Sequence, residues 1–226
     1  MNITFNPNNS MEQFHNNEYV VHLVNLCLDN MGDKLFDDIL ILIKKSSLEK
    51  AERYLLKMQS NYYDKGKINI FNDLKNTFLK IYSDDHVANL RGGFLELLSL
   101  KVFKNLYAFN EFSLDCNVII DGWISPKTVD IGMECGLEGL VCECKISRSE
   151  LDKDIINNLL LIKEKSDDYF SLFIVTLEDG RRLHHKLREM KRNENIDDLI
   201  KINIVVKNNF NKFCNGLFET YDDLNN

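Results

Sequence analysis

The sequence contains few of the residues that separate a chain into modules, since only 2 of its 226 residues are proline and 10 are glycine. So little proline excludes a rigid proline-rich linker. The longest apolar run, residues 39–43, is far shorter than the roughly 20 residues that a membrane-spanning helix needs. Residues 1–11 are polar and rich in asparagine, so they lack the apolar stretch of a secretory signal. These absences predict a cytoplasmic protein without membrane contact.

The charge balance is acidic, with a formal net charge of −7 and an isoelectric point near 5.3. This argues against a nucleic-acid coat protein or an avid non-specific binder. It does not exclude an enzyme that meets DNA or RNA along one basic face. Apolar residues make up 44% of the chain, enough to bury a core, and the length suits one large domain or two small ones.

The cysteines do not follow the paired spacing of a zinc or iron–sulfur site. In a cytoplasmic protein we expect them to be thiols. Cys142 and Cys144 alternate with charged residues, which predicts that both are buried in a strand. The six are Cys27, Cys116, Cys135, Cys142, Cys144 and Cys214.

Apolar residues at helical spacing dominate the first third of the chain. The spacing predicts helices over residues 19–30 and 34–45, from residue 47 onward, and over 68–82. A fifth helix is expected from about His86 to Leu106, after the capping residues 83–85. It contains Gly92 and Gly93, which cost about 1 kcal/mol each in a helix, so we expect close packing there. Residues 1–85 are therefore predicted to form an all-helical extension.

From residue 86 onward the pattern predicts an α/β domain that extends to residue 226. Strands are expected at 117–121, 128–133 and 139–146, joined as a meander by short turns. Ser147 and Glu150 have capping-box spacing, which predicts a helix from there to about Lys165. A buried strand at 171–177, a basic helix at 181–192 and a strand at 199–206 follow. The core order is thus helix, three-stranded meander, helix, strand.

Three charged residues are expected to meet on two neighbouring strands. Side chains two apart in a strand share a face, so Glu143 and Lys145 project together. On the preceding strand Asp130 faces away from Val129 and Ile131, which look like core residues. Two carboxylates and a lysine are costly to cluster unless they are solvated, paired or bound to a cation. Such oxygen ligands suit Mg²⁺, although a surface strand with a Glu–Lys pair remains the plainer interpretation.

This pattern resembles the PD-(D/E)xK nuclease superfamily. The resemblance runs over Pro126, Asp130 and the Glu143-Cys144-Lys145 triplet, although Pro126 is not adjacent to the aspartate. Arg91, Gly92 and Glu96 look like the first helix of that family. The resemblance covers about residues 89–177 and implies a restriction-endonuclease-like fold. It also implies that Asp130 and Glu143 bind Mg²⁺ or Mn²⁺, that Lys145 is catalytic, and that Glu96 is an auxiliary ligand.

The resemblance implies a metal-dependent nuclease, with DNA preferred over RNA and a role in restriction or anti-phage defence. An acidic chain with few obvious nucleic-acid contacts would engage its substrate as a homodimer or with an accessory protein, for which the helical extension is the natural contact. Two alternatives stay open: a non-catalytic nucleic-acid-binding or scaffold protein of the same fold, and a purely structural domain.

A basic helix is the second feature that points to nucleic acid. Its cations outnumber a single acidic residue, Glu189, in a chain that is otherwise acidic. Such a concentration can form a phosphate-binding face. An ordinary solvated helix is the alternative. The predicted nucleic-acid-binding residues are Arg181, Arg182, Lys186 and Arg188.

Overall fold

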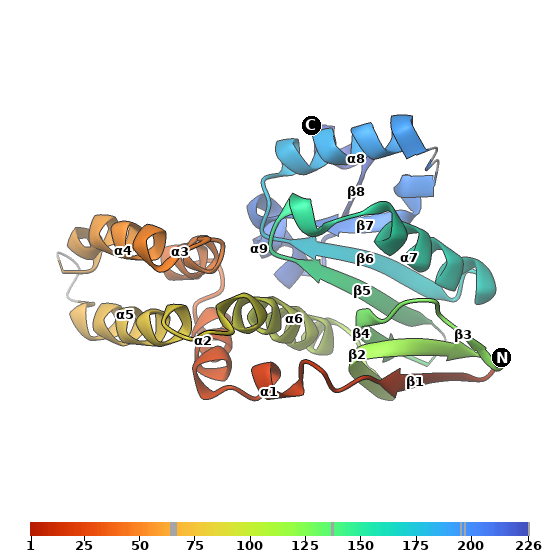
Figure 1. Ribbon diagram of the computed structural model, residues 1–226, viewed down its shortest axis with the longest axis horizontal. Helices are drawn as coiled ribbons and strands as arrows, with labels where there is room; N and C mark the ends of the chain where they lie inside the picture. Colours follow the sequence, from red (N-terminus) through yellow and green to blue (C-terminus); the bar gives the residue numbers. More distant parts are fainter. Residues whose placement is uncertain (64–66, 137, 195, 197, 226) are drawn as a thin grey trace. The chain divides into compact units, whose positions relative to one another are not determined.

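The computed structural model describes residues 1–63, 67–136, 138–194, 196 and 198–225 (Figure 1). The chain divides into two compact units. A helical unit contains residues 13–98, and a sheet unit contains residues 1–12 and 99–226. The division differs from the expected boundary at residue 85, because the boundary lies within one long helix and the N-terminal residues belong to the sheet unit.

The predicted helices of the first third are confirmed, most of them to within a residue or two. The Asn17 side chain starts the first long one by accepting hydrogen bonds from the backbone N–H groups of Tyr19 and Val20 at 3.0 and 3.3 Å. The helices are α1 (Glu12–His15), α2 (Glu18–Asp29), α3 (Lys34–Ile43), α4 (Leu48–Tyr63), α5 (Ile68–Tyr82) and α6 (Val87–Leu106), the last of which continues into the sheet unit.

Gly93 allows a close approach inside the helical unit, as expected from its cost in a helix. A Cβ at this position would lie 3.2 Å from Phe14 Cβ and 3.3 Å from the Phe14 carbonyl carbon. That is tighter than ordinary van der Waals contact, so a side chain here would force the Phe14 segment away from α6.

The C-terminus of α3 is capped by side chains from other helices. Its last carbonyl groups have no partner within the helix. The Tyr82 hydroxyl lies 2.6 Å from the carbonyl oxygen of Leu42 and 2.7 Å from that of Lys45. Arg91 Nε donates to the carbonyl oxygen of Ile43 at 2.6 Å. Burial raises the pKa of Tyr82 to about 12, although Arg91 acts in the opposite direction.

Removing the Tyr82 hydroxyl is expected to destabilise the helical unit. Tyr82→Phe removes the hydroxyl that Leu42 and Lys45 share as a donor and should lower the free energy of unfolding by about 0.5–1.5 kcal/mol. Because the folded-state pKa lies above the unfolded value of 10.0, this contribution is complete below pH 10 and is lost as the pH rises towards 12. Denaturant unfolding followed by circular dichroism at neutral and alkaline pH measures both effects.

The control for this substitution is Tyr63→Phe, because Tyr63 is 45% exposed. Tyr63→Phe should change neither the free energy of unfolding at neutral pH nor the decrease of that free energy at alkaline pH. Equal stability of Tyr82→Phe and the wild-type chain at neutral pH would contradict the proposed capping role.

The sheet unit is built on one mixed sheet, in which the described residues form eight strands. The order is β1-β2-β4-β5-β6-β7-β8, with β3 paired to β2. Neighbours from β1 to β5 are antiparallel, β5-β6-β7 are parallel, and β8 is antiparallel to β7. The strands are β1 (Ile3–Pro7), β2 (Glu111–Ile120), β3 (Trp123–Ile124), β4 (Val129–Glu134), β5 (Gly139–Lys145), β6 (Phe170–Thr176), β7 (Ile202–Val205) and β8 (Glu219–Thr220).

Helices cover both faces of the parallel strands, which explains why β6 is a nearly continuous apolar run. On one face Leu172 and Ile174 pack in the same core as residues of α7 and α8, including Leu159 and Leu187. On the other face Phe173 lies against Phe103 of α6, with ring centroids 5.0 Å apart. The remaining helices are α7 (Lys153–Lys165), α8 (Gly180–Glu194) and α9 (Phe210–Cys214), with short 3-10 turns at Arg148–Glu150, Asp198–Lys201, Lys207–Asn209 and Asp222–Asn225.

Two expectations about local structure are corrected. The N-terminal segment is not helical throughout: residues 3–7 form β1 beside β2, and Phe5 pairs with Val118 (Figure 1). The helix expected from Ser147 begins only at Lys153, where the Asp152 side chain caps it by accepting from Ile155 N at 2.9 Å. The predicted meander β2-β4-β5 is confirmed, with the two-residue strand β3 inserted after β2. None of the helices in the described part of the chain is both long and apolar enough to cross a bilayer.

Candidate active site

The predicted meeting of Asp130, Glu143 and Lys145 is confirmed in the sheet unit. Lys145 Nζ lies 2.9 Å from Asp130 Oδ2 and 2.7 Å from Glu143 Oε2. The exposed fractions of the three side chains are 19%, 5% and 18% in chain order. The ammonium group therefore links two carboxylates at the boundary between the core and solvent.

The site forms where β4 and β5 stop pairing. The last backbone pair between them is Ile131 with Cys142. Beyond it the Asp130 carboxylate takes the place of the ladder and accepts the backbone N–H of Cys144 at 2.6 Å. On its other side β5 stays paired with β6 as far as Lys145. The carboxylates are thus fixed by strands, at the carboxyl edge of β5 and β6.

Burial and charge set the protonation of this cluster. Burial, and then the Asp130 carboxylate, raises the pKa of Glu143 to about 8, against the opposing effect of Lys145. For Lys145 burial lowers the pKa, but the Asp130 and Glu143 carboxylates outweigh it and raise the pKa above its usual value. Lys145 is therefore an ammonium donor, and it offsets only part of the cost of burying Glu143, because the pKa of Glu143 stays raised.

The opposite side of β5 carries the two predicted buried thiols. Cys142 and Cys144 are 0% and 5% exposed, and their Sγ atoms lie 3.8 Å apart. All six cysteines are free thiols. Burial raises the pKa of the Cys142 thiol, so it is not a ready metal ligand or nucleophile.

The donor set of the cluster fits a hard divalent cation. Mg²⁺ typically takes one or two carboxylates and completes its shell with water and substrate phosphate. Asp130 and Glu143 supply two carboxylates, and Glu143 is too buried to be stabilised by water alone. Within residues 1–63, 67–136, 138–194, 196 and 198–225, no group of three or more His, Cys, Asp or Glu side chains is arranged to hold a metal ion. The chain would therefore supply two ligands to a metal ion. Lys145 would then give up part of its contact with the two carboxylates.

Glu96, the predicted auxiliary ligand, belongs to the helical unit. Its Oε2 lies 2.6 Å from His15 Nε2, and the side chains of both residues are 7% exposed. This buried pair ties α1 to α6 within that unit. A part for Glu96 in metal binding stays a prediction.

The predicted basic helix is confirmed as α8, and it starts directly beyond the edge that carries the cluster. Arg181, Arg182 and Arg188 are exposed, whereas Lys186 is half-buried. The apolar side of the helix is buried through Leu183, Leu187 and Met190.

Arg148 is a candidate that the sequence did not reveal. Its Nη1 donates to the backbone carbonyl oxygen of Arg182 at 3.3 Å, which joins the turn after β5 to the start of α8. In the sequence Arg148 stands inside an apparent capping box, and no local signal relates it to a helix more than 30 residues later. Asp121 lies in the turn after β2 and makes a long-range contact instead, since its Oδ1 accepts from Asn2 N at 2.7 Å.

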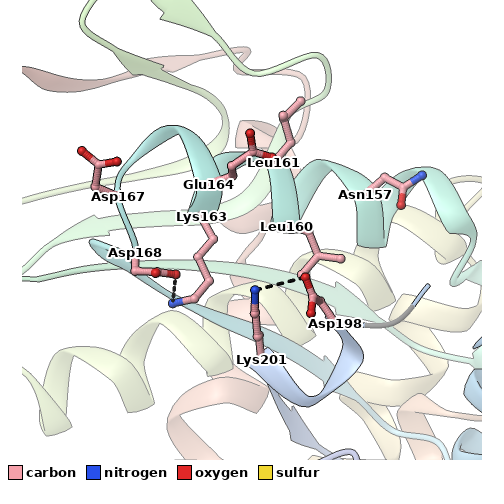
Figure 2. Close-up of a pocket in the computed structure, with 9 residues that line it drawn as sticks. All are labelled: Asn157, Leu160, Leu161, Lys163, Glu164, Asp167, Asp168, Asp198 and Lys201. Atoms are coloured by element: carbon pink, nitrogen blue, oxygen red, sulfur yellow. Dashed lines mark hydrogen bonds and ion pairs between the residues drawn. The ribbon is translucent and has the colours of Figure 1, made fainter. Parts of the chain in front are cut away.

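One pocket among the described residues lies away from the cluster. It has a volume of about 500 Å³ and is lined by polar residues and two leucines at the end of α7, and by Asp198 and Lys201 (Figure 2). Asp168 of this pocket precedes the first residue of β6, so the pocket is at the opposite edge of the sheet from Lys145. Its lysines are paired, Lys163 with Asp168 at 3.4 Å and Lys201 with Asp198 at 3.0 Å. We assign it no part in the chemistry.

Comparison with known proteins leaves the chain without an assigned family. No protein-family model matches it, and no curated protein matches its sequence. Among solved structures it is similar to protein VC1899 from Vibrio cholerae, with 12% sequence identity and a TM-score of 0.44. The match covers 95% of this chain and 57% of that chain, so the chain spans little more than half the length of this neighbour.

Proposed function

We propose that the chain is a divalent-metal-dependent nuclease that hydrolyses phosphodiester bonds, with DNA as the preferred substrate. The observation that supports this is the buried Asp130–Lys145–Glu143 cluster at the point where β4 and β5 part. The αβββαβ order of α6, β2, β4, β5, α7 and β6 is also similar to the core of the PD-(D/E)xK superfamily.

The roles of the residues follow from their placement. Asp130 and Glu143 would hold Mg²⁺ or Mn²⁺, because both are fixed by strands and converge on one cation already. When bound, the ion would polarise the scissile phosphate and lower the pKa of a coordinated water. Lys145 would orient the attacking water through its N–H groups and offset the negative charge that develops on the phosphate. The products are a phosphate monoester and an alcohol.

A cleavage assay tests the proposal directly. Supercoiled plasmid, linear duplex DNA, single-stranded DNA and RNA are incubated with Mg²⁺, with Mn²⁺ or with EDTA. We expect metal-dependent cutting of DNA by the wild-type chain and none by Asp130→Asn. The matched control is Asp198→Asn, which removes an exposed carboxylate from the opposite edge of the sheet and should cut normally. Cutting that persists in EDTA, or in Asp130→Asn, would refute the assignment.

The second candidate is a nucleic-acid-binding or scaffold protein of the same fold without turnover. It is favoured by one observation, that Lys145 already bridges both carboxylates. It predicts DNA binding by α8 with no cleavage of any substrate and no stabilisation by divalent metal. A role in restriction or anti-phage defence remains a proposal of the resemblance. A homodimer or an accessory partner remains a proposal from the acidic charge of the chain.

A further inference from the structure

Arg148 lies three residues beyond Lys145, in a turn that Glu150 holds in place. Glu150 Oε2 accepts the backbone N–H of Ile146 at 3.0 Å, which closes the turn directly after β5. Arg148 is exposed, and its Nη1 donates to the Arg182 carbonyl oxygen at 3.3 Å. Because that carbonyl carries no net charge, the contact positions the guanidinium without neutralising it. The other N–H donors of Arg148 stay available for a ligand.

A stripe of arginines continues from this point along α8. Arg181, Arg188 and Arg192 are spaced by seven and four residues, so they lie on one face of the helix. All three are exposed. At 1.5 Å per residue the stripe is about 16 Å long. It begins in the first turn of α8, which follows β6 at the carboxyl edge where Lys145 pairs with Thr176.

These guanidinium groups have little compensating charge. Within the described residues no carboxylate forms an ion pair with Arg148, Arg181, Arg182, Arg188 or Arg192. The Asp179 carboxylate at the helix start is occupied by the backbone N–H of Arg181 at 3.1 Å and by Asn208 Nδ2 at 3.3 Å. Glu189 pairs with His185 at 3.6 Å. A concentration of unpaired arginines in a chain of net charge −7 favours an anionic ligand.

From these contacts we infer that Arg148, Arg181, Arg182, Arg188 and Arg192 form a phosphate strip, which carries the DNA backbone away from the cluster without reading its bases. Guanidinium groups match phosphate oxygens in two-point hydrogen bonds. Phosphate contacts position a nucleic acid but carry no sequence information. The inference rests on the proposed function, and it adds Arg148 as a binding residue and makes binding independent of sequence.

The test measures binding without cleavage. The full chain in EDTA is titrated with two short DNA duplexes of unrelated sequence, over a range of salt concentrations around 0.15 M. Loss of one phosphate contact should weaken binding about fivefold at about 0.15 M salt and flatten the slope of log K against log salt by about 0.9. We expect Arg148→Ala and Arg181→Ala each to do so equally for both duplexes.

Two matched variants separate the strip from general charge effects. Arg148→Lys keeps the charge and should keep the salt slope. Lys201→Ala removes one cation at the opposite edge of the sheet and should leave the slope unchanged (Figure 2). Any of four results would overturn the strip. Arg148→Ala and Arg181→Ala could leave the salt slope unchanged, or weaken the binding of one duplex only. Lys201→Ala could have an equal effect, or the wild-type chain could fail to bind DNA.

The strip and the proposed hydrolysis can fail separately. One result is a slope of log K against log salt that flattens as expected in the arginine variants, while the wild-type chain cuts nothing with Mg²⁺. It supports the strip and refutes the proposed hydrolysis. The opposite result is metal-dependent cutting by the chain, with a salt slope that does not change when these arginines are replaced. It refutes the strip and leaves the proposed nuclease activity standing.

Discussion

Replacing Lys145 with methionine is expected to lower the rate of metal-dependent DNA cleavage by about 10²- to 10³-fold. That is the usual loss when one positioned donor to the developing charge is removed. Methionine keeps the apolar stem and deletes the ammonium that contacts Asp130 and Glu143 at 2.9 and 2.7 Å. Single-turnover cleavage at saturating protein measures the loss in the chemical step apart from binding.

Misfolding has to be separated from lost chemistry in this variant. Lys145→Met leaves the buried Glu143 carboxyl and the partly buried Asp130 carboxylate without their cation, which by itself destabilises the chain. Circular dichroism therefore accompanies the kinetics, and Asp130→Asn/Lys145→Met, which removes both charges, should recover part of the stability but none of the activity. Lys201→Met is the matched control, since it removes a lysine from an exposed ion pair. A folded Lys145→Met that cuts at the wild-type rate would show that Lys145 has no catalytic part.

Divalent metal is expected to stabilise the wild-type chain against thermal unfolding. A ligand that binds only the folded state adds about 2.7 kcal/mol at a hundred times its dissociation constant. For a chain of this size that corresponds to a rise in Tm of about 5–10 °C. The rise follows from placing a cation between carboxylates that the fold already holds close together.

Glu143→Gln and Asp130→Asn are expected to abolish this rise, because each removes one of the two carboxylate groups that would bind the metal. Asp198→Asn should retain it, since that carboxylate lies in the exposed pocket at the other edge of the sheet (Figure 2). Differential scanning fluorimetry with Mg²⁺, Mn²⁺ and EDTA gives the comparison. A wild-type Tm that does not respond to metal, together with no cleavage, would favour the non-catalytic alternative.

Much of the secondary structure could be predicted from the sequence, because periodicity reflects local geometry. The helical spacing located α2, α3 and α5 almost to the residue, and strand alternation located β4 and β5. Alternation also placed Glu143 and Lys145 on one face, opposite Cys142 and Cys144. Local signals failed at Ser147–Glu150, where the capping-box spacing is present but Glu150 holds a turn instead of a helix start.

The sequence by itself determined the charged trio, since the positions of Asp130, Glu143 and Lys145 follow from strand period and the order of elements. Only the tertiary structure decided that β4 and β5 part beyond Ile131 and Cys142, which brings the Asp130 carboxylate to Lys145. It also decided that β1 joins the sheet and that Arg148 meets Arg182. Those contacts join segments far apart in the chain, and their energy depends on packing, which no short window of sequence contains.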